Sequence, residues 1–150
     1  MRKHEIERKF LLDKEVLNLE KYQKIQIVQG YISLEPVVRI RKAGDFYYLT
    51  KKGKGLMIKE EVEEEISKQD FLTYSRKIIG NCIEKTRYFL PLDNDLIATL
   101  DIFSKQLLGL KIIEVEFSSL KAANDFIKPD WFGEEVTYNK DYYNVNLIFK

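Results

Sequence analysis

Apolar and polar residues alternate along most of this chain, which is the period-two pattern of β-strands that bury one face. Turn residues such as Pro36, Gly44-Asp45 and Pro91 interrupt the alternation at short intervals. Some seven or eight short strands separated by turns are typical of an all-β barrel or sandwich. Strands are expected at residues 5–10, 25–35, 37–42, 46–52, 58–66, 83–90, 96–103 and 112–117.

Segments between these strands have helical features instead. Ser67 suits the N-cap of a helix over residues 68–79 that closes at Gly80-Asn81, because a serine hydroxyl can accept from the first free amides and glycine suits a helix end. Ser118 or Ser119 similarly suits the cap of a helix that runs to Ile127. A short helix or a loop is expected at residues 13–24 and a flexible loop at residues 53–55. Residues 139–149 suit a short closing helix or a strand, and the helix is favoured.

The charged residues of a strand fall on one of its two faces. In the first strand Glu5, Glu7 and Lys9 share a face, while Ile6 and Phe10 lie on the other. Two interpretations follow from this pattern. The charges face solvent around an apolar core, or helices cover the apolar faces from outside and the charges turn into a closed barrel. The second interpretation requires water, metal ions and a highly charged ligand inside, because charges are hardly ever buried dry and unpaired.

Composition narrows the class of protein. A chain of 150 residues with 45% hydrophobic residues is expected to form one globular domain over residues 1–150. It has no apolar run of membrane-spanning length and no secretory signal, and Cys82 is its only cysteine, so a cytoplasmic protein without membrane association is expected. His4 is the only histidine, which excludes zinc sites built on several His or Cys ligands. The net charge of +1 argues against nucleic acid as a partner.

The N-terminal run Glu5-Ile6-Glu7-Arg8-Lys9-Phe10 resembles the ExExK signature of the CYTH superfamily, the triphosphate tunnel metalloenzymes. ExExK alone is a weak pattern, but the resemblance continues in the expected order over nearly the whole chain and is closest to small bacterial inorganic triphosphatases. The further motifs are Gln29-Gly30-Tyr31, Arg39-Ile40-Arg41, Thr50-Lys51-Lys52, Glu61-Val62-Glu63, Glu84-Lys85-Thr86-Arg87-Tyr88, Leu100-Asp101, Glu114-Val115-Glu116-Phe117 and Trp131-Phe132-Gly133-Glu134-Glu135-Val136-Thr137.

This resemblance implies an eight-stranded antiparallel β-barrel, mainly β with helices packed outside, whose charged tunnel binds a small anionic triphosphate with Mg²⁺ or Mn²⁺. The implied phosphate-binding residues are Lys9, Arg39, Arg41, Lys52, Lys59 and Arg87. The implied metal ligands are Glu5, Glu7, Glu114 and Glu116, with Glu61, Glu63 and Asp101 as further tunnel acids. Family members often carry an arginine where Lys59 stands, which replaces a fork-shaped phosphate donor with a point charge.

In a subset of small bacterial members a lysine and a tyrosine are implicated in catalysis, and the matching residues here are Lys85 and Tyr31. A lysine among arginines loses its proton more easily than usual, so Lys85 suits a general base. Two simpler roles stay open: Lys85 binds phosphate only, and Tyr31 packs only.

The expected function is metal-dependent hydrolysis of triphosphates, above all of inorganic tripolyphosphate to pyrophosphate and phosphate. The alternatives are a thiamine triphosphatase or class IV adenylate cyclase, and a non-catalytic polyphosphate-binding module. The organic substrates require a pocket for the organic group, for which the motifs show no aromatic or amide cluster. A module that only binds anions would not call for so many tunnel acids. A homodimer is a further, open expectation.

Overall fold

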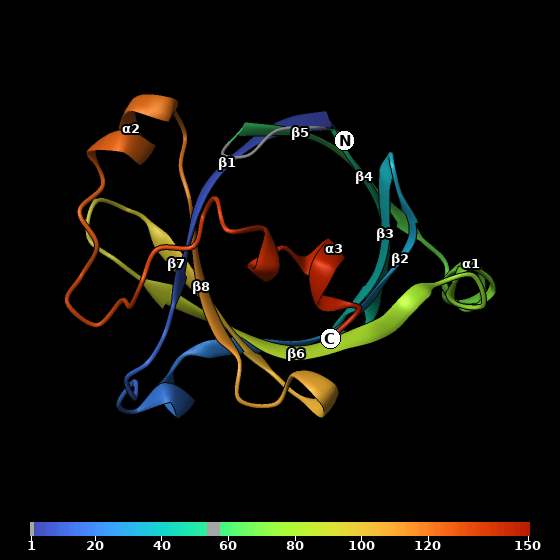
Figure 1. Cartoon of the computed structure of the whole chain (residues 1–150), viewed down its shortest axis with the longest axis horizontal. Helices are drawn as coiled ribbons and strands as arrows, with labels where there is room; N and C mark the ends of the chain where they lie inside the picture. The colour runs from blue at the N-terminus through green and yellow to red at the C-terminus, as the bar shows by residue number, and fades with distance from the viewer. Residues whose placement is uncertain (1, 54–57) are drawn as a thin grey trace.

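Eight strands close into a single antiparallel barrel in the described part of the chain, in the order β1-β5-β4-β3-β2-β6-β7-β8 (Figure 1). The computed structural model describes the backbone of residues 2–53 and 58–150 and the side chains of residues 4–53 and 60–150. The strands are β1 (Arg2–Leu11), β2 (Gln23–Leu34), β3 (Val37–Ala43), β4 (Phe46–Lys52), β5 (Ile58–Ile66), β6 (Ile79–Pro91), β7 (Ile97–Phe103) and β8 (Lys111–Glu116).

The predicted barrel is therefore confirmed, and its strands lie where the alternation placed them to within a few residues. The largest difference is at the start of β6. Helix α1 begins as predicted, because Ser67 Oγ accepts from Asp70 N at 3.0 Å. It spans Lys68–Ser75, so the prediction that it continues to Ile79 and closes at Gly80-Asn81 is wrong. Ile79 instead opens β6 and pairs with Tyr31.

Gly80 shows why the segment after α1 is extended and not helical. Its φ is +64°, and a Cβ at this position would lie 2.7 Å from the carbonyl oxygen of Ile148. The neighbouring amide of Asn81 donates to the same Ile148 oxygen at 2.7 Å. The glycine therefore permits a close contact with the C-terminal segment, and no helix ends there.

The remaining helices differ in their place relative to the barrel. Helix α1 and helix α2 (Leu120–Asp125) lie outside the strands, as predicted, whereas helix α3 (Asn144–Leu147) lies within the ring (Figure 1). The prediction that all helices pack outside is thus wrong for α3. Short 3-10 helices are η1 (Leu19–Lys21), η2 (Lys105–Leu107) and η3 (Lys140–Tyr142). The expected loop at residues 53–55 has Lys54 and Gly55 outside the described residues.

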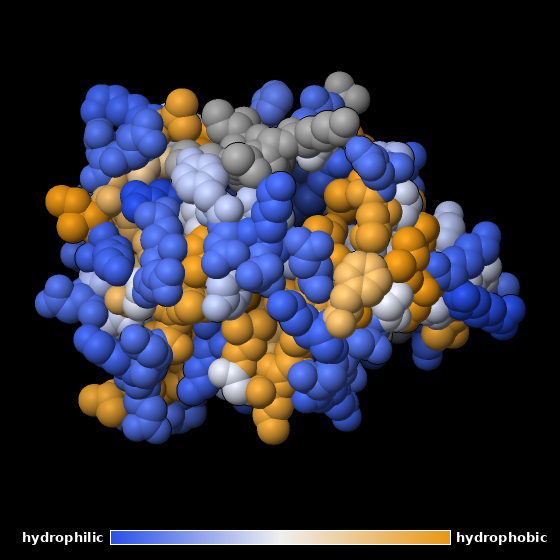
Figure 2. All heavy atoms as spheres, in the orientation of Figure 1, coloured by the Kyte–Doolittle hydropathy of each residue, from blue (hydrophilic) through white to orange (hydrophobic). Residues whose placement is uncertain are grey.

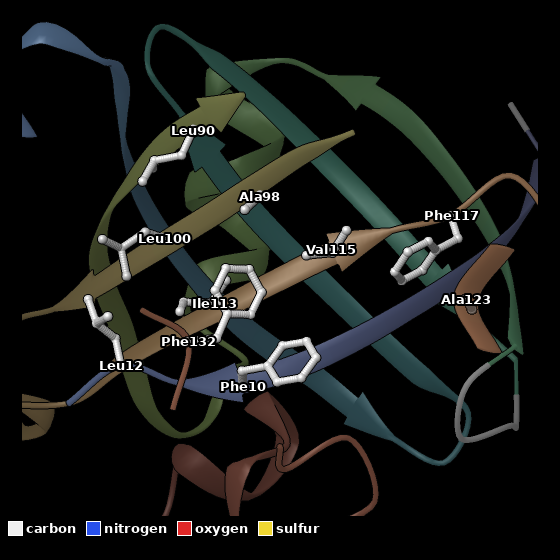
Figure 3. Close-up of a cluster of buried hydrophobic side chains, with 10 residues drawn as sticks. All are labelled: Phe10, Leu12, Leu90, Ala98, Leu100, Ile113, Val115, Phe117, Ala123 and Phe132. Carbon is white, nitrogen blue, oxygen red and sulfur yellow. The ribbon is translucent and has the colours of Figure 1, made fainter. Parts of the chain in front are cut away.

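The first buried cluster lies on the outer side of β1, β7 and β8, where α2 and the segment after it cover the sheet (Figure 3). Its centre is Phe10, whose ring centroid is 5.0 Å from that of Phe132 and 6.3 Å from that of Phe126. Full burial of a side chain of this size contributes about 1.5–3 kcal/mol. The cluster comprises Phe10, Leu12, Leu90, Ala98, Leu100, Ile113, Val115, Phe117, Ala123 and Phe132.

The second buried cluster lies inside one end of the barrel. This is the end where β1, β2 and β7 finish and where β3, β6 and β8 begin. Leu147 of α3 and the adjacent Ile148 pack here against strand residues that point inward. The segment around α3 therefore fills this end of the barrel. The cluster comprises Tyr31, Ile83, Phe103, Leu107, Ile112, Leu147 and Ile148.

The segment that leads to α3 is held along the second half of β1. Leu11 N donates to Glu134 O, Gly133 N to Leu11 O, and Val136 N to Lys9 O, each at 2.8 Å. β5 pairs with the first half of β1 only, so this segment occupies the edge that β5 leaves. A row of strand amides and carbonyls is thereby satisfied, which removes an exposed strand edge.

Outside the barrel, Arg8 forms hydrogen bonds that hold Glu135 and the end of α2 against β1. Its guanidinium donates to both carboxylate oxygens of Glu135, at 2.8 and 2.6 Å, and its Nη1 donates to the carbonyl oxygens of Ala123 and Phe126 at 2.9 and 3.0 Å. Thr137 Oγ1 also donates to Glu135 and accepts from the amide of Lys9. We call this group of Arg8, Glu135 and Thr137 the outer clamp.

The surface seen down the barrel is mostly hydrophilic, with apolar areas between the charged side chains (Figure 2). Among the described residues, none of the helices has the length and apolar character needed to cross a bilayer.

Candidate active site

The charged residues that alternate along the strands meet inside the barrel. Antiparallel register places Lys9 opposite Glu114, Lys52 opposite Glu61 and Arg87 opposite Asp101, and residues opposite each other project to the same side. They surround a cavity of about 1030 Å³. The predicted site residues that line it are Glu5, Glu7, Lys9, Tyr31, Arg39, Arg41, Lys52, Glu61, Glu63, Arg87, Glu114 and Glu116.

The lining is divided by sign into two halves. The acidic wall, as we call it, comes from the three adjacent strands β8, β1 and β5 and consists of Glu5, Glu7, Glu61, Glu63, Glu114 and Glu116. The basic wall comes from β4, β3 and β6, with the uncharged Tyr31 of β2 between them, and consists of Lys52, Arg39, Arg41 and Arg87. Lys9 of β1 also lines the cavity, and its Nζ lies 3.7 Å from Glu114 Oε1. A ligand in this cavity is therefore contacted by carboxylates on one side and guanidinium groups on the other.

The basic wall holds buried donors that lack acceptors. Arg39 Nη2 donates to Thr50 Oγ1 at 3.2 Å and lies 3.8 Å from Glu63 Oε1, but its Nε has no hydrogen-bond partner among the described residues. Arg41 Nε donates to Gln29 Oε1 at 2.9 Å, and the Nε2 of that glutamine is likewise buried without a partner there. An unmet buried donor is costly, so the wall is suited to an acceptor-rich ligand such as a phosphate chain.

Burial lowers the pKa of two residues of the basic wall, whereas the pKa of Arg87 is raised, because the charge of Asp101 and the hydrogen bonds to it outweigh burial. The pKa of Arg41 is lowered, chiefly by burial and then by the charges of Arg39 and Arg87. The pKa of Lys52 is lowered by burial and by Arg39. Guanidinium groups stay charged at neutral pH. An anion between them would relieve the repulsion that these shifts express.

In the acidic wall, Glu5 and Glu61 form a carboxyl pair. Burial alone would raise the pKa of Glu5, but its hydrogen bond with Glu61 and the nearby Lys52, 3.2 Å away, outweigh burial and lower it to about 2. The pKa of Glu61 is raised to about 7 by burial, then by the hydrogen bond and charge of Glu5. The pair therefore shares a proton near neutral pH, because two adjacent carboxylates do not both ionise readily.

Glu114 is a half-buried member of the acidic wall and lies opposite Lys9. Burial would raise its pKa, yet the charges of Lys9, Arg87 and Lys85 and a hydrogen bond with Glu7 leave the pKa well below its usual range. This carboxylate is consequently charged at all ordinary pH values.

The acidic wall fits a hard divalent cation by its donor chemistry. Within the described ranges, no three His, Cys, Asp or Glu side chains are already arranged as a metal site. The six carboxylates of the acidic wall nevertheless line one cavity, and carboxylate oxygen is the donor that Mg²⁺ and Mn²⁺ prefer. The proton shared by Glu5 and Glu61 marks a place that is short of positive charge, which a cation would supply.

Lys85 and Asp101 lie behind the basic wall, in contact with Arg87. The Lys85 Nζ is 2.7 Å from Asp101 Oδ2, and Arg87 Nε and Nη2 donate to the two oxygens of Asp101 at 2.8 and 2.9 Å. The side chains of Lys85 and Asp101 are 0% and 2% exposed, and neither residue is part of the described cavity lining. Asp101 thus forms ion pairs with two cations, Lys85 and Arg87.

The environment of Lys85 moves its pKa close to neutrality. Burial lowers the pKa to about 7, against the attraction of Asp101 and with help from the positive charges of Arg87 and Arg41. The burial of Asp101 would raise its own pKa, but the charges of Lys85 and Arg87 and the hydrogen bonds from Arg87 leave it lowered. Lys85 is therefore divided between its charged and neutral forms near pH 7, which is the condition a general base needs.

The two predicted catalytic residues occupy different layers. Tyr31 is only 3% exposed but lines the cavity, whereas Lys85 lies beneath it, with Nζ 5.3 Å from the ring centroid of Phe103 in the cluster that includes Tyr31. Lys59 is opposite Glu5 in the backbone register of β1 and β5, but its side chain lies outside the described residues.

Several residues of the site were given no role by the sequence. Gln29 and Thr50 stand in the quoted motifs and contact Arg41 and Arg39. Phe89 and Ile97 stand outside the motifs and line the cavity near the hairpin between β6 and β7. The available signal was the alternation: each residue lies two positions from a predicted site residue or further along the same strand face.

Comparisons with known proteins agree with this geometry. No family model matches the chain. The inorganic triphosphatase of Nitrosomonas europaea is 38% identical over 95% of this chain and 95% of its own length. The inorganic triphosphatase of Acetivibrio thermocellus is 34% identical over 96% of this chain and 92% of its own.

Solved structures show the same barrel. The crystal structure of an inorganic triphosphatase matches with a TM-score of 0.72 and 36% identity, over 97% of this chain and 95% of that one. A putative adenylyl cyclase from Hippeastrum, described as having a dominant triphosphatase activity, matches with a TM-score of 0.59 over 80% of this chain and 82% of its own. At 17% identity the latter supports the fold alone.

A closed antiparallel barrel with opposed acidic and basic walls inside defines the triphosphate tunnel, or CYTH, class of proteins. Within that class, the chain belongs to the inorganic triphosphatase family. Triphosphatases of this family are in general metal-dependent.

Proposed function

We propose that this protein hydrolyses inorganic tripolyphosphate to pyrophosphate and phosphate inside the barrel, with Mg²⁺ or Mn²⁺. The observation that carries the proposal is the opposition of the two walls around one cavity. A triphosphate is rich in acceptor oxygens and carries several negative charges, and Arg39, Arg41 and Arg87 can each grip phosphate oxygens through two donors. Lys9, Lys52 and Lys59 would add point charge.

The acidic wall would hold the cation on the other side of the phosphate chain. Glu5, Glu7, Glu114 and Glu116 are the proposed ligands, with Glu61 and Glu63 as further acids on the same wall. Such an ion, when bound, polarises phosphate oxygens and lowers the pKa of water. The role of the carboxylates is to fix its position against the arginines opposite.

For proton transfer we propose the pair Lys85 and Tyr31. Neutral Lys85 can take up the proton that water loses as it attacks the terminal phosphorus, while the bridging P–O bond breaks and pyrophosphate leaves. Lys85 lies beneath the cavity lining, so the proton must pass through a group that reaches the cavity, and the Tyr31 hydroxyl is suited to this. Asp101 would stabilise the lysinium that forms.

Three finer expectations are part of the same proposal. The choice between Mg²⁺ and Mn²⁺ rests on the carboxylate donor set, which suits both ions. A cytoplasmic location rests on the single Cys82. A homodimer is proposed without a surface assigned to it.

A substrate panel tests the proposed function. Phosphate release is measured from tripolyphosphate, ATP and thiamine triphosphate with each metal. Tripolyphosphate should have a kcat/KM at least about tenfold above ATP, or about 1.4 kcal/mol, because most binding energy comes from the phosphates and the metal. No cyclic AMP should form. Cyclic AMP production, or a clear preference for thiamine triphosphate, would contradict the proposal.

A further inference from the structure

The acidic and basic walls meet at β4, which lies between β3 of the basic wall and β5 of the acidic wall. Three residues stand in register across these strands, since Arg39 is opposite Thr50 and Thr50 is opposite Glu63. Residues that are opposite each other project to the same side of a sheet, so the three side chains form one row on the inner face. Thr50 is the neutral member of this row and stands between a guanidinium and a carboxylate.

The hydroxyl of Thr50 bridges these two charged groups. Thr50 Oγ1 accepts from Arg39 Nη2 at 3.2 Å and donates to Glu63 Oε1 at 3.0 Å, because a hydroxyl can do both at once. Arg39 Nη2 and Glu63 Oε1 are themselves 3.8 Å apart, which is too far for a direct hydrogen bond. Thr50 is 0% exposed and does not contribute to the described cavity lining, so it can act on a ligand only through its neighbours.

A second contact between the walls, further along β4, has no such bridge. Lys52 is two residues from Thr50 on the same strand face, and its Nζ donates directly to Glu5 Oε1 at 3.2 Å. A guanidinium beside a carboxylate can form a stronger pair than a lysine does, because it donates two parallel hydrogen bonds. Arg39 does not form that pair, although Glu63 lies within its reach.

A direct pair with Glu63 would compete with the binding of a phosphate. Arg39 is 3% exposed and lines the cavity, and its Nε has no hydrogen-bond partner among the described residues. A phosphate oxygen can meet the guanidinium only while Arg39 is not turned towards Glu63. The apparent affinity for a ligand falls with the fraction of protein in which its binding group is engaged elsewhere.

We infer that Thr50 is a positioning residue, whose hydroxyl keeps Arg39 from pairing directly with Glu63 and holds the guanidinium available to phosphate. The inference rests on the proposed triphosphatase function, because that function gives Arg39 its ligand. Valine has the same branched shape as threonine and lacks the hydroxyl. Thr50→Val therefore removes the bridge and retains a residue that suits the strand.

The test combines the structure of Thr50→Val with its kinetics. In a crystal structure of the unliganded variant, Arg39 Nη2 and Glu63 Oε1 should be in direct contact, at about 2.8 Å. KM for tripolyphosphate should rise about tenfold, which corresponds to about 1.4 kcal/mol, while kcat stays within about threefold. Thr50→Ser retains the hydroxyl and should leave both constants within about twofold of the wild type. The matched control is Thr73→Val, at an exposed threonine of α1, and it should change nothing.

A double-mutant cycle separates positioning from packing. Arg39→Met removes the group that Thr50 holds, so the addition of Thr50→Val to this variant should lower kcat/KM by less than about twofold. Additive losses would overturn the role of Thr50, because they would show that it acts without Arg39. A wild-type KM in Thr50→Val, or an unchanged separation of Arg39 and Glu63, would overturn it as well.

Absence of tripolyphosphate hydrolysis in the wild type would overturn the proposed function instead. Calorimetric binding of tripolyphosphate with Mg²⁺ to the same variants would then decide on Thr50. A dissociation constant about tenfold higher in Thr50→Val would support its role, by the same 1.4 kcal/mol or about that. An unchanged dissociation constant, or no binding to the wild type, would overturn it.

Discussion

The acidic and basic walls of the tunnel arise from the same alternating pattern, yet the acidic wall lacks positive charge and the basic wall lacks hydrogen-bond acceptors. The acidic wall is short of positive charge, so that Glu5 and Glu61 share a proton near neutral pH. The basic wall is short of acceptors, with the Nε of Arg39 buried and unpaired among the described residues. A phosphate chain with a metal ion supplies both at once. The two walls together are therefore suited to the proposed metal–phosphate complex.

The comparison predicts that loss of a carboxylate from the acidic wall abolishes turnover. Glu116→Gln keeps the shape of the side chain and removes a charged metal ligand, so kcat should fall by at least about 10³-fold, which is comparable to the loss of a central electrostatic contact. Phosphate release with Mg²⁺ or Mn²⁺ measures it, and a chelator should abolish the activity of the wild type.

The matched control for this variant is Glu64→Gln. Glu64 is an exposed glutamate of β5 and lies opposite Leu49, on the outer face of the barrel. The variant Glu64→Gln should retain a kcat within about twofold of the wild type, because a charge on the protein surface is largely screened. Undiminished turnover in Glu116→Gln would remove this residue from the metal site.

On the basic side, Lys85→Ala should lower kcat by about 10²-fold, at the lower end of the contribution of a general base. The pKa of Lys85 is lowered to about 7, and the neutral form is the base, so wild-type kcat should rise as pH increases through about 7 and level off above it. The variant should lose this rise. A large increase in KM with kcat and the pH profile preserved would instead make Lys85 a residue that supports phosphate binding only.

Arg39 should matter for binding more than for turnover. Arg39→Lys removes the fork-shaped donor and keeps the charge, and kcat/KM for tripolyphosphate should fall by about 10–100-fold, equivalent to one or two hydrogen bonds to a charged group. Steady-state kinetics measure the change, and most of it should be in KM. An unchanged kcat/KM would show that the buried Nε of Arg39 does not contact substrate.

The outer clamp provides a contrast, because Arg8 carries the same charge outside the tunnel. Arg8→Ala removes four hydrogen bonds to Glu135, Ala123 and Phe126, and should lower the free energy of unfolding by about 1–3 kcal/mol. Urea unfolding measures it. At a temperature well below the transition, kcat should change by less than about threefold, and a much larger loss would indicate that the clamp positions Lys9 for catalysis.

The strands and the inward charges could be predicted because both follow from period-two alternation and from paired motifs such as Arg39-Ile40-Arg41. The end of α1 could not be predicted, because Ile78 and Ile79 suit a helix as well as a strand. The contact that decides between them joins Gly80 to Ile148, which is distant in the sequence. The inner position of α3 depends on the same distant packing. Lys85 could be assigned to the barrel interior, but its full burial could not be predicted, because it depends on Phe103 opposite it and on the ion pair with Asp101.

The pairing of residues 133–137 with β1 has a consequence for how the chain folds. Lys9 and Thr137 are 128 positions apart, so this contact closes a loop that is nearly as long as the described chain. Contacts of such sequence separation form late and slow the folding of a domain. During synthesis, one edge of the second half of β1 stays unpaired until residues 133–137 have left the ribosome. An unpaired strand edge can associate with other chains. Refolding yield should consequently fall with protein concentration more steeply than the stability of the finished barrel would suggest.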